Sequence, residues 1–144
     1  MKILMGVDGS EFSRVVLQAT VKQFRIEDTE VQVLHVLQPT APVVPEMAAG
    51  YAPELAVQKK PASELVERIA KELVSAGFKV KTAVEIGDIR ETIIDSAAAW
   101  NADLIVVGSH GQRGIRRFML GSVAGFVARH AKCSVEIVRT PVGG

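Results

Sequence analysis

The sequence is poor in the features that mark secreted and membrane proteins. It has a single cysteine, Cys133, which leaves no partner for an internal disulfide and suits a reducing compartment. No run of about 18 consecutive apolar residues is present, so no membrane-spanning helix is expected. The opening MKILMGVDGS lacks the apolar core and the cleavage site of a secretory signal. We therefore expect a soluble protein of the cytoplasm.

A strong charge of one sign is also absent. The 17 basic residues nearly balance the 16 acidic ones, which leaves a formal net charge of +1. A protein that binds nucleic acid through a basic field needs a larger excess, so we expect no nucleic-acid partner. No histidine and cysteine cluster has metal-ligand spacing, and no metal site is expected. The 144 residues, 48% of them hydrophobic, suffice for one globular domain spanning 1–144.

Short apolar runs alternate along the chain with segments of helical periodicity. The two most continuous runs, Ile3–Val7 and Leu104–Val107, are typical of central strands covered on both faces. The predicted strands are Lys2–Val7, Val31–Leu37, Lys79–Ile86, Asp103–Val107 and Ser134–Arg139. The predicted helices run from a Ser10 cap to about Phe24, over Glu64–Ala76 up to Gly77, over Ile89–Trp100 after an Asp88 cap, and over Val123–Ala131 after a Ser122 cap.

The order of these elements predicts the fold. Alternating strands and helices form an α/β structure with a mostly parallel sheet, because parallel strands need crossovers and those crossovers are right-handed. We expect an open, doubly wound, five-stranded sheet of order 3-2-1-4-5 with helices on both faces, a Rossmann-like architecture. The alternating run Lys79–Ile86 is expected near an edge. Residues 38–61 hold most of the six prolines and are expected to form a long surface loop.

Glycine-bearing loops follow the first and fourth predicted strands. The winding of such a sheet reverses between these strands, and ligands bind in the crevice at their carboxyl ends. The stretch VGSHGQRGIRRFMLGSV brings bare backbone, the arginines Arg113, Arg116 and Arg117, and a helix start into that crevice, which suits an anion such as phosphate. The alternative is that the glycines only form turns and that Arg116 and Arg117 line a solvated face. The patterns GxxxxGK[ST] and GxGxxG are absent.

Several other residues have a plain structural interpretation beside a functional one. Asp8 follows a buried strand and either contacts a ligand or caps the loop before the first helix. His35 is expected to be a hydrogen-bonded core histidine, and His110 is expected to contribute backbone rather than acid–base chemistry. Cys133 is expected to be a small buried hydrophobe, and Trp100 a packing residue.

The spacing of the glycines carries a resemblance to a known family. Gly108, Gly111, Gly121 and Ser122 form the pattern G-x2-G-x9-G-S, and the segments KILMGVDGSEFS, VLHV, ADLIVVGSHG and SVEIVR match as well. Over essentially its whole length the chain resembles the nucleotide-binding branch of the universal stress protein family, whose fold is adenine nucleotide alpha hydrolase-like. The resemblance implies that the ligand is ATP, which Mg²⁺ can accompany.

The same resemblance assigns residues to parts of the ligand. It implies backbone contacts to adenine from Gly6 and Val36, and it implies that Asp8 lies beside the ribose. The residues that it assigns to the ribose and phosphates are Gly108, Ser109, His110 and Gly111, and those that it assigns to the triphosphate are Gly121, Ser122 and Val123. Arg113 is expected to add a charge-assisted contact from the same loop.

The resemblance also implies a homodimer, because family members commonly pair through the last strand. Lys132 and Ser134 stand where many relatives have prolines, and Glu136 replaces a usual aliphatic residue. A charge in an edge strand weakens or redirects pairing.

Three functions are compatible with these patterns. The first is an ATP-binding regulatory or stress-response protein with little or slow hydrolysis, since no side chain in the motifs is clearly placed to orient an attacking water. The second is a slow ATPase or a nucleotide-transferring enzyme of the same fold. The third is a ligand-free dimeric interaction module.

Overall fold

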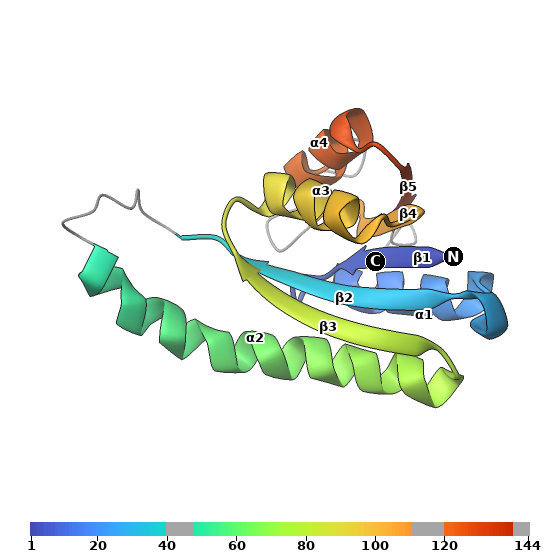
Figure 1. The fold of residues 1–144 in the computed structure, drawn as a ribbon, viewed down its shortest axis with the longest axis horizontal. Coiled ribbons are helices and arrows are strands. Elements are labelled where there is room, and N and C mark those ends of the chain that lie inside the picture. The colour runs from blue at the N-terminus through green and yellow to red at the C-terminus, as the bar shows by residue number, and fades with distance from the viewer. Residues whose placement is uncertain (40–47, 111–119, 140–144) are drawn as a thin grey trace.

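The computed structural model of the chain describes residues 1–39, 48–110 and 120–139, and within these ranges the side chains of 48–56 are not described. Five parallel strands form one sheet of order β3-β2-β1-β4-β5, as the sequence predicts (Figure 1). The elements are β1 (Lys2–Gly6), α1 (Glu11–Gln23), the short 3-10 helix η1 (Ile26–Asp28), β2 (Glu30–Leu37), α2 (Ala48–Ala76), β3 (Lys79–Ile86), α3 (Ile89–Trp100), β4 (Leu104–Gly108), α4 (Ser122–His130) and β5 (Ser134–Val138).

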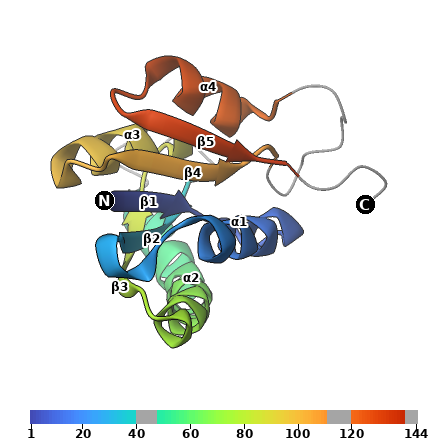
Figure 2. The ribbon, with the colours of Figure 1, turned by 90° about the vertical axis from the view of Figure 1, so that its right-hand side faces the viewer.

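The helices cover both faces of the sheet, α1 and α2 on one side and α3 and α4 on the other (Figure 2). Alternate residues of the central strands therefore enter two separate cores. Met5 packs with Val16 of α1 and Leu73 of α2, whereas Leu4 shares the opposite core with Ile93 of α3. Because β1 and β4 are buried on both faces, their sequences are continuously apolar. The doubly wound α/β fold is confirmed.

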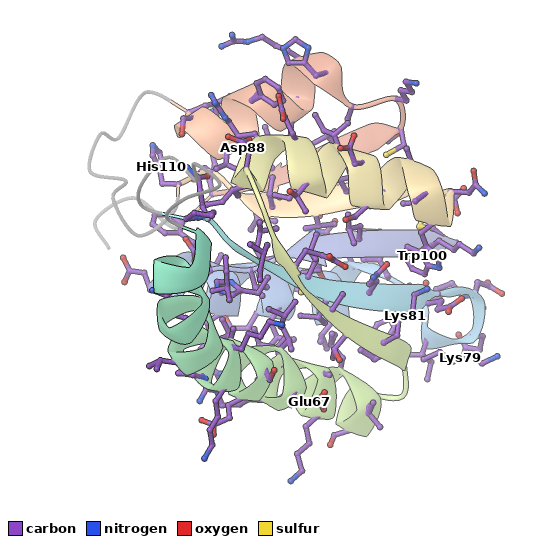
Figure 3. The ribbon with its side chains drawn as sticks, turned by 60° about the vertical axis from the view of Figure 1, so that its left-hand side comes forward. Glu67, Lys79, Lys81, Asp88, Trp100 and His110 are labelled. Carbon is purple, nitrogen blue, oxygen red and sulfur yellow. The ribbon has the colours of Figure 1, made fainter. Side chains whose placement is uncertain are left out.

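The predicted edge strand β3 lies at one end of the sheet and β5 at the other. β3 carries exposed Lys79, Lys81 and Glu85 along its length. At its start, Lys81 Nζ lies 4.4 Å from the centre of the Trp100 ring, and Lys2 Nζ lies 5.5 Å from it (Figure 3). Trp100 thus packs beneath two cations at the end of α3, in agreement with the packing role predicted for it.

The prediction of a surface loop over residues 38–61 is wrong in its second half, because α2 begins at Ala48 rather than at Glu64. Two prolines, Pro53 and Pro61, lie inside this helix. Each costs a helix interior about 3 kcal/mol, but the residues around them are mostly alanine, leucine, glutamate, glutamine and lysine, which are strong helix formers. The predicted end at Gly77 is confirmed, since Gly77 has φ +109° and Phe78 N donates to the Leu73 carbonyl at 3.1 Å.

Candidate functional site

The predicted crevice lies where the winding of the sheet reverses. From β1 the chain enters α1 on one face, and from β4 it leads to α4 on the opposite face (Figure 1). The carboxyl ends of these neighbouring strands carry Asp8 and Ser109, so the two glycine-bearing loops flank the same point of the sheet. His110 and Asp88 lie at this end of the molecule, opposite the end that carries Trp100 (Figure 3).

The loop after β1 is organised around the carboxylate of Asp8. Its Oδ1 accepts hydrogen bonds from Ser10 N at 2.9 Å, Ser10 Oγ at 2.6 Å and Ser13 Oγ at 3.1 Å. In return, Ser13 Oγ accepts from the amides of Asp8 at 2.9 Å and Gly9 at 3.2 Å. Asp8 therefore caps this loop, and its contact with a ribose stays a prediction. The predicted cap of α1 is confirmed, because Ser10 Oγ accepts from Phe12 N at 3.2 Å.

Sequence reasoning missed Ser13 and Phe12 as parts of this site. Ser13 is buried on the inner side of α1, where a hydroxyl needs a partner, and the spacing of Asp8, Ser10 and Ser13 was the available signal. Phe12 left no such signal, because its role depends on the other loop: a Cβ on Gly108 would lie 2.9 Å from Phe12 Cβ. Gly108 is thus the point at which the two walls of the crevice touch.

Ser109 joins the loop after β4 to β5 and to the start of α4 through backbone hydrogen bonds. Ser109 N donates to the Val138 carbonyl of β5 at 2.8 Å, and the Ser109 carbonyl accepts from Gly121 N at 2.8 Å. A Cβ on Gly121 would lie 3.0 Å from that same carbonyl oxygen and 3.2 Å from His110 Cα. A larger residue at 121 would therefore push the start of α4 away from the loop.

The start of α4 differs from the sequence prediction. Ser122 is the first residue of the helix and not its cap; Gly121 holds the N-cap position and makes no side-chain capping bond. The bond from Gly121 N to Ser109 keeps Gly121 outside the helix. In contrast to α1 and α3, which Ser10 and Asp88 cap, α4 presents the amides of Ser122 and Val123 without an acceptor among the described residues.

His110 adds a second unpartnered donor or acceptor beside this helix start. Its Nδ1 lies 3.2 Å from Ser109 Oγ, and its ring centre lies 5.7 Å from that of Phe12. Its Nε2 is buried and has no hydrogen-bond partner in the part of the chain that the structure describes. Buried polar atoms are nearly always paired in folded proteins, so an orphaned ring nitrogen at this place fits a bound polar group.

The residues assigned to adenine lie on the neighbouring strands. A Cβ on Gly6 would lie 3.2 Å from Val107 Cγ1 and 3.5 Å from Ile93 Cδ1, so the backbone of β1 is bare where the sheet meets α3. Val36 is buried near the carboxyl end of β2. His35 is the hydrogen-bonded histidine that the sequence predicts, with Nδ1 2.7 Å from the Val7 carbonyl. The structure does not describe Gly111, Arg113, Arg116 and Arg117. What the sequence predicts for these residues stays a prediction.

Of two hollows on the described surface, one adjoins this site and the other does not. A groove of about 460 Å³ lies between α3 and α4 and begins at the Gly121–Ser122 helix start. We call it the α3–α4 groove, and it is lined by Arg90, Leu120, Gly121, Ser122, Gly125, Phe126 and Arg129. The larger hollow, of about 860 Å³, lies between α2 and β3 and is lined mainly by charged and aliphatic side chains. It is remote from the orphaned donors at the switch point, so its greater volume does not make it the better candidate.

The described residues contain no group of three potential metal ligands, and none of the described helices is long and apolar enough to cross a membrane. Cys133 is half-buried and packs against the core beneath α3 and α4, which agrees with its predicted role as a small hydrophobe.

Cys133 is expected to react slowly with iodoacetamide at neutral pH. Burial raises the pKa of its thiol above the ordinary value of a cysteine, and the negative charge of Asp103 acts in the same direction, against an opposing backbone hydrogen bond. A raised pKa means less thiolate at a given pH, and the thiolate is the reactive form. Alkylation should be several-fold slower in the native protein than in the protein unfolded by urea, and mass spectrometry measures both rates. Equal rates would contradict this account.

Comparison with known proteins gives a consistent result. The model of the family described as the universal stress protein family matches residues 1–139. Universal stress protein YxiE of Bacillus subtilis is 32% identical, over 96% of this chain and 98% of its own. Among solved structures, hypothetical protein MJ0577 is similar with a TM-score of 0.86 and 30% identity, covering 99% of this chain and 97% of its own.

Some of the similar structures hold adenine nucleotides. A universal stress protein in complex with cAMP has a TM-score of 0.63 and 27% identity, covering 98% of each chain. Structures with AMP, from Arabidopsis thaliana, and with dAMP, from Archaeoglobus fulgidus, are 19% and 23% identical with TM-scores of 0.69 and 0.65, over 99% and 96% of this chain and 93% and 97% of theirs. At that identity the last two show the shared fold alone.

Proposed function

This chain belongs to the universal stress protein family, and from that premise we propose that it binds ATP at the carboxyl ends of β1 and β4. In this proposal it acts as a nucleotide-dependent regulatory protein of the stress response, with little or slow hydrolysis. The protein that holds cAMP supports an adenine nucleotide as the class of ligand. Within that class we propose ATP as the preferred ligand.

The observation that carries the proposal is the uncapped start of α4. The amides of Ser122 and Val123 have no acceptor within residues 1–39, 48–110 and 120–139, and they form a positive helix end without the side-chain cap present on α1 and α3. Such an end binds phosphate through its amides and its dipole. The buried and unpartnered Nε2 of His110 supplies one more polar group beside it.

The residues present fit a nucleotide. The backbone at Gly6 and Val36 would meet adenine, Asp8 would lie by the ribose, and the glycines at 108 and 121 leave the backbone bare next to the phosphates. The full set that we assign to the nucleotide is Gly6, Asp8, Val36, Gly108, Ser109, His110, Gly111, Arg113, Gly121, Ser122 and Val123. When bound, ATP with Mg²⁺ would bring a reactive phosphoanhydride, and this chain's residues would hold and shield it.

The hydrogen bonds of one carboxylate oxygen of Asp8 support slow hydrolysis. A carboxylate that activates water needs a lone pair aimed at that water. Three protein donors already occupy Asp8 Oδ1, which makes this oxygen a structural acceptor for the loop. We therefore expect the protein to retain ATP rather than turn it over.

The first experiment is to release and identify the nucleotide that the purified protein carries. Heat-denatured protein is cleared, and the soluble fraction is analysed by chromatography and mass spectrometry. Stoichiometric ATP supports the proposal; ADP or AMP directs the work to a timed ATP assay, in which steady turnover would favour the slow-ATPase alternative. An empty protein that also shows no thermal shift with added ATP would overturn nucleotide binding and leave the ligand-free module.

We further propose that the protein is a homodimer paired through β5, and that Glu136 weakens this pairing. β5 is an open edge with fewer charges than β3, and Glu136 is the middle residue of its five. The Oε2 atom of Glu136 is buried and has no hydrogen-bond partner among the described residues. In an antiparallel pair centred on Glu136, the two carboxylates would face each other, and directly opposed like charges destabilise a strand pair.

Replacing Glu136 with valine is accordingly expected to strengthen dimerisation about tenfold, a change of about 1.4 kcal/mol. Sedimentation equilibrium measures the dissociation constant of the dimer. Glu85→Val makes the same chemical change on the opposite edge strand and should leave that constant unchanged. An equal gain from both variants would mean that general surface hydrophobicity, and not the β5 edge, drives association.

A further inference from the structure

The α3–α4 groove continues from the proposed phosphate site along the side of α4 that adjoins α3. Gly121 and Ser122 line its beginning, and Gly125 and Arg129 line it further along the same helix. Gly125 is one helical turn, about 5.4 Å, from Gly121. The groove and the helix start therefore share a wall, while α3 supplies the opposite wall through Arg90.

Two guanidinium groups, those of Arg90 and Arg129, line this groove, and each makes a different contact. Arg90 Cζ lies 5.0 Å from the centre of the Phe126 ring, and the centre of the His130 ring lies 4.3 Å from that of Phe126. Arg129 lies back along its own helix, with Nη2 3.6 Å from the position that a Cβ on Gly125 would take. Gly125 is a poor helix former, but its missing side chain keeps the floor of the groove open beside Arg129.

The charges in the groove do not balance. Arg90 Nη2 is 3.7 Å from Asp88 Oδ2, so part of its charge is offset at the rim. Arg129 has no ion pair among the described residues. Two guanidiniums therefore face one carboxylate in a hollow of about 460 Å³. Arginine presents a planar fork of donors that matches phosphate oxygens, and an aromatic face beneath it reduces the freedom that binding has to remove.

We propose that the α3–α4 groove binds the β- and γ-phosphates of the nucleotide, and that Arg129 and Arg90 set a preference for triphosphate over monophosphate. This inference rests on the nucleotide site proposed above and specifies what distinguishes ATP from AMP there. Arg129 makes the larger contribution, because Asp88 competes for Arg90. Adenosine monophosphate has no group that reaches past the start of α4, so its affinity is independent of both arginines.

The test compares the affinities of ATP, ADP and AMP by isothermal titration calorimetry at low ionic strength, where contacts of exposed charges are least screened. Arg129→Gln should lower ATP affinity about tenfold and Arg90→Gln about threefold, as expected for the loss of a charge-assisted hydrogen bond. AMP affinity should stay within about twofold in both. Arg68→Gln, which removes an arginine from the hollow between α2 and β3, is the matched control and should change neither affinity.

A second variant tests the groove without removing a charge. Gly125→Leu fills the floor of the groove between α3 and α4 and should also lower ATP affinity while sparing that of AMP. Equal losses for ATP and AMP, or unchanged ATP affinity in Arg129→Gln and Gly125→Leu, would overturn the proposal and leave the nucleotide site standing. A native protein that binds none of the three nucleotides would refute the proposed function itself, and the groove assignment with it.

Discussion

Replacing Ser122 with aspartate is expected to weaken ATP binding about a hundredfold while leaving the protein as stable as before. The added carboxylate would stand at the first residue of α4, beside the amides assigned to the triphosphate. Two like charges about 4 Å apart repel with about 4 kcal/mol at the effective dielectric of a protein surface. Ser122 is exposed, so solvent screens part of that repulsion, and a hundredfold loss corresponds to about 2.7 kcal/mol.

The stability of the same variant separates repulsion from misfolding. A negative charge in the first turn of a helix stabilises it by about 0.3–1 kcal/mol, so the melting temperature of Ser122→Asp should be unchanged or slightly raised. Ser122→Asn has nearly the same shape without the charge and should bind ATP more tightly than Ser122→Asp by at least about tenfold. Full ATP affinity in Ser122→Asp would place the phosphates elsewhere.

Gly121→Asp also introduces a carboxylate at this helix start and is expected to abolish ATP binding. It is a less selective test, because its Cβ would lie 3.0 Å from the Ser109 carbonyl oxygen. Part of its effect would come from displacement of the loop, and a lowered melting temperature would report that part. Together, Ser122→Asp and Gly121→Asp separate the effect of an added charge on ATP affinity from the effect of an added side chain that displaces the loop.

The sheet could be predicted from the sequence because strands that are buried on both faces consist of consecutive apolar residues. Ile3, Leu4 and Met5 are all fully buried, as are Ile105 and Val106, so no polar residue interrupts either run. Once five strands and the helices between them were located, right-handed crossovers left few possible sheet orders. The exposed charges of β3 likewise mark it as an edge strand.

The extent of α2 could not be predicted because local and long-range preferences disagree there. Prolines argue for a loop, whereas the helix-forming residues around Pro61 favour continuation, and Ala62 and Val66 then bury their side chains on the sheet. At the start of α4 the sequence predicts Ser122 as the cap, whereas Gly121 holds that position in the structure. The hydrogen bond from Gly121 N to Ser109, which joins the helix start to the loop after β4, decides between them.

The sequence predicts where the candidate site lies, but it predicts only some of the side-chain contacts within the site. Glycine spacing located the two loops, but the role of Ser13 in holding Asp8 depends on the turn between them. The groove beside the site depends on Arg90 and Arg129, which lie on different helices. Together with Phe126 they line one groove only in the folded chain. Such pairings arise from how α3 and α4 pack, for which the local sequence carries no signal.

Gly108→Ala is expected to destabilise the protein by about 1–3 kcal/mol, the usual cost of adding a methyl group where there is no room. The new Cβ would lie 2.9 Å from Phe12 Cβ and 3.3 Å from the His110 carbonyl oxygen, so the start of α1 or the loop after β4 has to move. For a domain of this size the melting temperature should fall by roughly 3–9 °C. ATP affinity should fall as well, because Phe12 is bonded to the Ser10 cap that also holds Asp8.

Gly125→Ala is the matched control, and its effect on stability should have the opposite sign. There the new Cβ would lie 3.6 Å from Arg129 Nη2, an ordinary contact with a flexible side chain. Alanine in place of glycine inside a helix stabilises by about 0.5–1 kcal/mol, so this variant should melt at or above the temperature of the native protein. A Gly108→Ala protein that melts with the native chain would mean that α1 can move away from β4 without cost. The contact between Gly108 and Phe12 would then not be what sets the width of the crevice, and another pair of residues would have to hold its walls together.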